Sequence, residues 1–152
     1  MENLVLRKAV PADMESIKSL QLDTFFGEQC IPKKDVVAPF DRSDVQWWCA
    51  VSQDQLLGAV AAWPESGQYH WGRFAVSPKS RGRHIGTGLA KFSLEDLFSQ
   101  GVSEIHMEAR ETTVKIICNL GGKVVGPAVE FYKGTVTPVV VKREDYNALA
   151  DI

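Results

Sequence analysis

The spacing of apolar residues changes along the chain, and each change predicts a new element. Residues 4–10 favour a strand that ends at Pro11. A helix should follow, because proline suits a first helical turn and Met14, Ile17 and Leu20 recur at helical spacing. This opening pattern predicts a strand followed by an amphipathic helix.

The middle of the chain is dominated by residues typical of strands. Residues 25–44 mix polarities and contain a glycine and two prolines, so we expect a loop there with at most a short helix. Residues 46–51 and 56–63 are rich in aromatic and β-preferring side chains, and the polar residues between them predict a hairpin. A third strand is expected at 69–76.

The second half of the chain alternates between helical and strand patterns. Residues 77–88 form a loop rich in glycine and basic residues, and a helix should follow that ends near Gly101. The alternation over 104–110 predicts a half-buried strand, and a shorter helix is expected at 112–120. Closing strands are expected at 124–125, 129–132 and 138–141. This order indicates an α/β or α+β sheet protein.

Length and composition agree with this succession of elements. The chain has 152 residues, of which 45% are hydrophobic and 24% charged, so we expect a single domain over residues 1–152. No apolar stretch reaches the length of a membrane span, and the first residues lack the pattern of a signal or transit peptide. We therefore expect a cytoplasmic protein with no membrane partner.

The net charge conceals an uneven distribution. The formal charge is −2, but residues 66–94 contain five basic residues and no acidic one, which leaves 12 basic and 19 acidic residues elsewhere. A cationic island in an acidic protein favours a small anionic ligand, because broad nucleic-acid binding usually needs a basic domain. A chance fluctuation of surface charge is the alternative.

Cysteine and histidine do not form a disulfide or metal pattern. Cys30, Cys49 and Cys118 are odd in number and widely spaced, so we expect reduced, buried thiols. The three histidines are too scattered for a helical metal motif. No metal site is predicted.

The loop at residues 77–88 has the composition of an anion site. A strand that leads through glycines into a helix leaves backbone N–H groups without intrahelical partners beyond the helix N-terminus. Gly86 and Gly88 would let a pyrophosphate approach the main chain closely. Charge-assisted contacts would come from Lys79, Arg81 and Arg83. A plain connection whose glycines only turn the chain is the alternative.

Two phosphate-binding motifs can be compared with this loop. A nucleoside triphosphate loop is disfavoured, because Gly88 is not followed by lysine and serine or threonine. A dinucleotide fingerprint fits in part, since Gly86 and Gly88 supply G-x-G and Glu108 lies 20 residues further on. Lys91 replaces the third glycine, and residues 77–85 separate the strand from the G-x-G. An NAD(P)-binding oxidoreductase is therefore the less favoured hypothesis.

The same residues resemble motif A of the GCN5-related N-acetyltransferase (GNAT) superfamily. That motif follows a strand ending in Val-x-Pro, here Val76 and Pro78, and its core Gln/Arg-x-x-Gly-x-Gly/Ala is matched by Arg83, Gly86 and Gly88. The resemblance implies a GNAT-like fold with a central mixed, mostly antiparallel sheet flanked by helices. It also implies an N-acetyltransferase that moves the acetyl group of acetyl-CoA directly to a primary amine of a small molecule or protein.

The resemblance assigns a cofactor site as well. In the family the loop amides hold the pyrophosphate of coenzyme A, and the preceding strand contacts pantetheine. A backbone N–H near Val76 would polarise the acetyl carbonyl and stabilise the oxyanion. His84 stands where the family often has glycine, and its side chain is expected to point outward. The expected cofactor-binding residues are Phe74, Ala75, Val76, Arg81, Gly82, Arg83, His84, Ile85, Gly86, Thr87 and Gly88.

Attack by an amine on the thioester is helped by a base, because a lysine-like amine has a pKa near ~10.4 and is almost fully protonated at neutral pH. Strand alternation places His70 on one face with Gly72, Phe74 and Val76, which makes it a candidate catalytic base. Glu108, on the polar side of a later strand, is the other candidate. The alternatives are a solvated histidine and a structural or substrate-orienting carboxylate.

Two positions depart from the family pattern. Ile117 stands where a tyrosine often protonates the leaving thiolate, and residues 110–113 replace a common asparagine, with Thr113 a candidate for the lost pantetheine contact. A non-catalytic CoA-binding module of the same fold is therefore the second hypothesis.

The acceptor amine is not identified by the sequence. Residues 25–44 are expected to cover the acceptor side, as the corresponding segment does in the family. The four tryptophans are expected mainly in the core rather than in a pocket. Nucleic acid is not an expected partner, and a homodimer stays open, with the strand at 139–141 as a candidate edge for pairing.

Overall fold

A central sheet carries the fold, and the computed structural model describes residues 3–147. Its strands are β1 (Val5–Lys8), β2 (Gln46–Ser52), β3 (Gln55–Glu65), β4 (Gln68–Val76), β5 (Glu104–Ala109), β6 (Lys123–Val124), β7 (Val129–Glu130) and β8 (Thr135–Lys142). Their order across the sheet is β1-β2-β3-β4-β5-β8-β6, and β7 also pairs with β8. Only the β4–β5 pair is parallel among these described strands. The expected mixed, mostly antiparallel sheet is confirmed.

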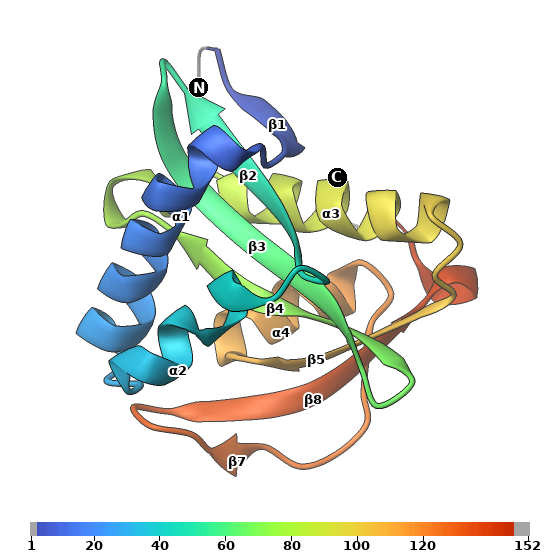
Figure 1. The fold of residues 1–152 in the computed structure, drawn as a ribbon. Coiled ribbons are helices and arrows are strands. Elements are labelled where there is room, and N and C mark those ends of the chain that lie inside the picture. Colours follow the sequence, from blue (N-terminus) through green and yellow to red (C-terminus); the bar gives the residue numbers. More distant parts are fainter. Residues whose placement is uncertain (1–2, 148–152) are drawn as a thin grey trace.

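Helices cover both faces of the sheet (Figure 1). They are α1 (Met14–Gln21), α2 (Lys33–Val37), α3 (Ile85–Ser99) and α4 (Glu111–Asn119). On one face α1 and α2 pack over β2–β4 in a core centred on Ile17, Val36 and Trp47. On the other face α3 and α4 enclose a core that includes Trp48, Leu94 and other apolar side chains. The two cores fix the sheet between two helical layers.

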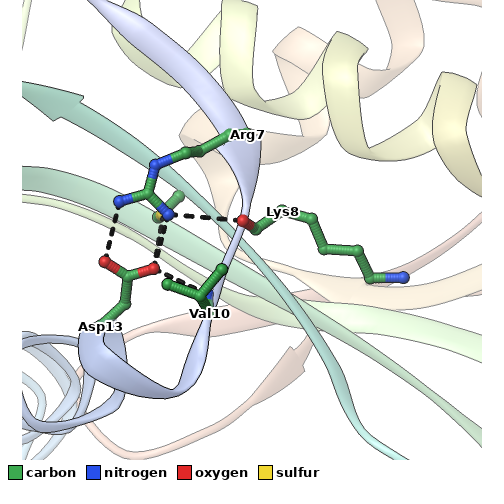
Figure 2. A network of polar contacts seen from close by, with 5 residues as sticks. Arg7, Lys8, Val10 and Asp13 are labelled. Carbon is green, nitrogen blue, oxygen red and sulfur yellow. Dashed lines mark hydrogen bonds and ion pairs between the residues drawn. The ribbon is translucent and has the colours of Figure 1, made fainter.

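A network of polar contacts joins β1 to the start of α1 (Figure 2). The guanidinium of Arg7 donates to both carboxylate oxygens of Asp13, at 2.6 and 2.9 Å. The same carboxylate accepts the backbone N–H of Val10 at 2.8 Å. This pairing holds the pKa of Asp13 below its usual value. Beside it, burial raises the pKa of the Cys49 thiol to about 11.

The segment between α1 and β2 is more helical than its sequence indicates. The expected loop instead contains a π-helix at Leu22–Glu28, helix α2 and a 3₁₀-helix at Ala38–Asp41. The π-helix continues directly from α1 and buries Thr24 and Phe25. Tertiary burial of these side chains outweighs the local glycine and proline signals.

A bulge in β4 changes which residues share a face. Arg73 and Phe74 lie opposite the single residue Val60 of β3, and Arg73 has a positive φ of 60°. The extra residue reverses the pleat, so Phe74 packs against the α3–α4 core while His70 lies on the α1–α2 face. The expectation that His70 shares a face with Phe74 and Val76 is therefore wrong.

Three further expectations can be checked. Strand β8 lies between β5 and β6, and Val139 and Val140 are paired on both sides, so the stretch 139–141 is not the open edge that was expected. Cys49 is buried, but Cys30 and Cys118 are exposed, so only one of the three thiols is buried as expected. No helix within residues 3–147 is long and apolar enough to cross a membrane.

Candidate cofactor and acceptor site

The two central strands β4 and β5 part after two paired positions. Tyr69 pairs with Ile105 and His70 with His106, after which β5 continues only along β8. A cavity of about 430 Å³ lies in this region, bounded by β4, β5, the segment from the π-helix to α2, and the turn between β7 and β8. The parting of the strands thus places backbone from the middle of the sheet on the wall of a cavity.

The β4 bulge on this wall is held in place from the α1–α2 face. The Arg73 guanidinium donates to the carbonyls of Asp35 at 2.7 Å and Val36 at 2.9 Å. The backbone carbonyl of Arg73 accepts a hydrogen bond from the buried side-chain amide of Gln21 at 2.8 Å. Burial lowers the pKa of Arg73. These contacts keep a non-glycine residue in the left-handed region, which is unfavourable in isolation.

His70 stands where β4 and β5 part, and its ring lies on the cavity. It stacks on Trp63, with ring centroids 6.3 Å apart, and its side chain is 20% exposed. Its Nε2 lies 3.8 Å from a carboxylate oxygen of Glu65. His106 is a ring neighbour at 6.0 Å, but its Nε2 contacts Glu104 at 2.8 Å instead. His70 therefore combines access to the cavity with a nearby carboxylate.

Glu108 also lines the cavity, on the same face as His70. It alternates with Met107 and Ala109, which belong to the opposite, α3–α4 core. Glu108 is exposed. The structure thus brings the two candidate bases to one cavity from two neighbouring strands.

The loop between β4 and α3 provides a backbone cradle. Gly82 and His84 both have positive φ values, 80° and 63°, and α3 begins directly after them at Ile85. His84 is exposed, as expected. The helix starts earlier than expected, so Gly86 and Gly88 lie in its first turn. The N–H of Gly88 donates to the carbonyl of His84 at 3.1 Å, whereas the N–H groups that precede it in the turn have no acceptor within the helix and are available to an anion.

The close approach of α3 to β4 explains one of these glycines. A Cβ on Gly86 would lie 3.0 Å from the Phe74 ring and 3.5 Å from a Val76 methyl group. A larger side chain would push the helix N-terminus away from the strand.

Not all five basic side chains of the segment 66–94 face this loop. Arg81 pairs with Glu28 of the π-helix through two contacts of 3.0 and 2.9 Å and donates to the carbonyl of Val76 at 2.9 Å. Arg73 is turned toward α2. Lys79 and Arg83 are exposed beside the loop. The expected use of Arg81 for phosphate therefore competes with an ion pair already present.

Comparisons with known proteins agree with this architecture. Residues 14–126 match the family model described as the acetyltransferase (GNAT) family. The chain belongs to the GNAT family. No curated protein matches the sequence of the chain.

Solved structures show the same fold at low sequence identity. ElaA of Escherichia coli superposes with a TM-score of 0.79 at 17% identity, covering 93% of this chain and 100% of the other. An acyl-CoA N-acyltransferase from Pseudomonas aeruginosa gives 0.78 at 16% identity, with 91% and 97% covered. The PaiA N-acetyltransferase of Thermoplasma acidophilum, in complex with coenzyme A, gives 0.68 at 14% identity, with 91% and 98% covered.

The positions that depart from the GNAT pattern lie in different places. Ile117 is fully buried in the α3–α4 core, whereas Thr113 lines the cavity. Of the four tryptophans, Trp47, Trp48 and Trp71 are buried as expected and Trp63 is only partly buried. Trp63 and Trp71 both line the cavity. In this GNAT chain Ile117, at the position where the family often has tyrosine, thus packs in the core and does not line the cavity.

Sequence reasoning missed two arginines of the cavity, Arg73 and Arg110. Arg73 carries no signal, because a bulge with a non-glycine residue in the left-handed region has no reliable sequence pattern. Arg110 stands at the start of the segment that replaces the GNAT asparagine, so its position was visible but its contacts were not.

Proposed function

We propose that the protein is an N-acetyltransferase that uses acetyl-CoA and a primary amine. The observation that carries the proposal is the parting of β4 and β5 after His70 and His106, with a cavity where the pairing stops. Membership of the GNAT family and neighbours solved with coenzyme A support the same cosubstrate.

In this proposal the cosubstrate lies along the cradle and the parted strand. The amides of residues 82–87 hold the pyrophosphate at the N-terminus of α3, where the helix dipole favours negative charge, and Gly88 leaves the main chain open to close approach. The backbone of residues 74–76 runs along pantetheine. A backbone N–H near Val76 donates to the carbonyl oxygen as it becomes an oxyanion.

The chemical step is a direct transfer. The amine lone pair attacks the thioester carbonyl carbon, and the tetrahedral intermediate collapses with cleavage of the carbon–sulfur bond, so that the electron pair leaves on the CoA sulfur. His70 accepts the proton that the amine loses, and Glu65 stands beside it to stabilise the imidazolium. Glu108 is the second candidate base because it faces the same cavity.

A non-catalytic CoA-binding module is the second candidate function. It is favoured by Ile117, which is fully buried where GNAT enzymes often place the tyrosine that protonates the thiolate. An assay of CoA thiol release with a broad panel of amines separates the two candidates, because only the transferase releases thiol in an amine-dependent manner.

Calorimetry with acetyl-CoA, CoA and NADPH tests the cofactor assignment. Arg83 is exposed on the proposed cradle, so Arg83→Glu should raise the Kd for acetyl-CoA at least about ten-fold by placing a carboxylate near the phosphates. Arg143→Glu makes the same charge change at an exposed site of the 3₁₀-helix after β8 and should leave the Kd near the wild-type value. Binding of NADPH alone, or equal weakening by both variants, would contradict the assignment.

A further inference from the structure

Arg110 lies at the acceptor side of the cavity. It follows β5 directly and has extended backbone angles, φ −68° and ψ 160°, so the alternation of the strand continues through it. Met107 and Ala109 belong to the α3–α4 core, and Arg110 therefore shares the opposite face with Glu108. That face is the one covered by α1, the π-helix and α2.

The guanidinium of Arg110 is fixed at one end and unsatisfied at the other. Its Nη1 donates to the carbonyl of Phe131 at 2.8 Å, and the group lies 5.2 Å from the centre of the Phe131 ring. Its Nη2 is buried and has no hydrogen-bond partner within residues 3–147. Buried donors without a partner are rare in folded proteins and call for a water, an ion or a ligand.

No carboxylate neutralises this charge. Within the described residues Arg110 forms no ion pair, and burial lowers its pKa. A guanidinium presents paired N–H groups whose geometry matches a carboxylate. The buried position of Nη2 strengthens the attraction of this end of the guanidinium for an anion.

The rest of the cavity offers the complementary chemistry. His70 and the carboxylates of Glu65 and Glu108 line it as well, and these groups suit an amine. Its volume, about 430 Å³, is in the range of small-molecule sites. The cavity thus presents groups of both signs to one ligand.

We propose that Arg110 binds a carboxylate of the acceptor, and that the acceptor is a small molecule carrying both an amine and a carboxylate, as an amino acid does. The inference rests on the proposed acetyl transfer and names its acceptor class. Arg110 acts on the bound acceptor and takes no part in bond making or breaking.

The experiment measures CoA thiol release with L-amino acids and their carboxamides as matched acceptor pairs. The wild-type protein should favour the free acids. Arg110→Gln should lower kcat/KM for the acid at least about ten-fold more than for the amide, mainly through KM. Because each variant is compared by its acid-to-amide ratio, the different basicity of the two amines cancels. Arg110→Lys keeps the positive charge but loses the paired N–H groups of the guanidinium, so it should recover part of the wild-type acid-to-amide ratio.

A matched control removes a different cation from the same turn. Lys133 is exposed and does not line the cavity, so Lys133→Gln should keep the wild-type ratio. Thermal unfolding and the Kd for acetyl-CoA show whether Arg110→Gln is folded. If it is not, Arg110→Lys replaces it in the comparison and should give an acid-to-amide ratio below the wild-type value.

Several outcomes overturn the inference. An acid-to-amide ratio that Arg110→Gln leaves unchanged shows that Arg110 acts on the thioester or on packing. Acetylation restricted to amines without a carboxylate excludes the acceptor class. These results are distinct from failure of the proposed function, in which acetyl-CoA does not bind or no amine promotes thiol release.

Discussion

Single side chains on the cavity wall carry the chemistry proposed for this protein. His70 is placed by three independent features, namely the last β4–β5 pair, the stacking on Trp63 and the carboxylate of Glu65. The residue type suggested a base, but only the bulge in β4 shows that the imidazole lies apart from the face of Phe74 and Val76. The proposed base and the Phe74 side chain therefore lie on opposite faces of the same strand.

His70→Ala should lower the rate of acetyl transfer and leave the Kd for acetyl-CoA near its wild-type value. Protonation of the amine lowers the rate of both proteins in acid, but a histidine base also works only as neutral imidazole, so the acid limb of the wild-type profile should be steeper than that of the variant. A loss of about 100-fold is expected. His106→Ala is the matched control, because His106 lies on the same face and its Nε2 contacts Glu104. An unchanged pH profile in His70→Ala would remove His70 from the mechanism.

Asp13 should make stability depend on pH. Its folded-state pKa is lowered by the hydrogen bonds from Arg7, so its contribution is present above the unfolded-state pKa and is lost as pH falls below about 4. Asp13→Asn should cost roughly 1 to 3 kcal/mol in urea unfolding at pH 7, and less at pH 3. Asp44 has a similar arginine partner but its side chain is 47% exposed, so Asp44→Asn should cost little. Equal effects of the two variants would refute the role of burial.

At the scale of elements, the periodicity of apolar residues predicted most strands and helices, whereas irregular features escaped it. The half-buried alternation over β5 and the hairpin of β2 and β3 follow from local side-chain preference. The π-helix, the β4 bulge and the early start of α3 depend on contacts with distant segments, such as Arg73 with α2 and Gly86 with β4. Local side-chain propensity does not depend on such long-range contacts and therefore cannot predict them.

Glycines at the ends of α3 and α4 allow a test of one such contact. Gly101 and Gly121 both follow a helix with positive φ, 98° and 106°, but a Cβ on Gly121 would overlap the carbonyl oxygen of Asp145, whereas Gly101 faces open space. Gly101→Ala should therefore cost only backbone strain, about 1 kcal/mol. Gly121→Ala should cost about 3 kcal/mol or more. Denaturant unfolding measures both, and equal costs would show that the contact with Asp145 yields easily.

At the scale of the whole molecule, the uneven charge pointed to the proposed cradle but not to the use of each charge. Lys79 and Arg83 are exposed beside the cradle, whereas Arg81 is paired with Glu28 and Arg73 supports the bulge. The motif with Gly86 and Gly88 predicted the family and the fold. Residues 25–44 were expected to cover the acceptor side, and residues of this segment line the cavity. That the turn between β7 and β8 joins the cavity wall was not predictable, because the turn is far from that segment along the chain.

The parting of β4 and β5 also bears on self-association. It leaves two strand borders without a neighbour inside the sheet, and free borders usually invite pairing with another chain and lead to aggregation. Each of these borders belongs to a strand whose other side is already occupied, β4 by β3 and β5 by β8. An incoming polypeptide would have to wedge between two anchored strands. These free borders are therefore enclosed within the sheet and do not offer an outer edge on which a larger sheet could grow.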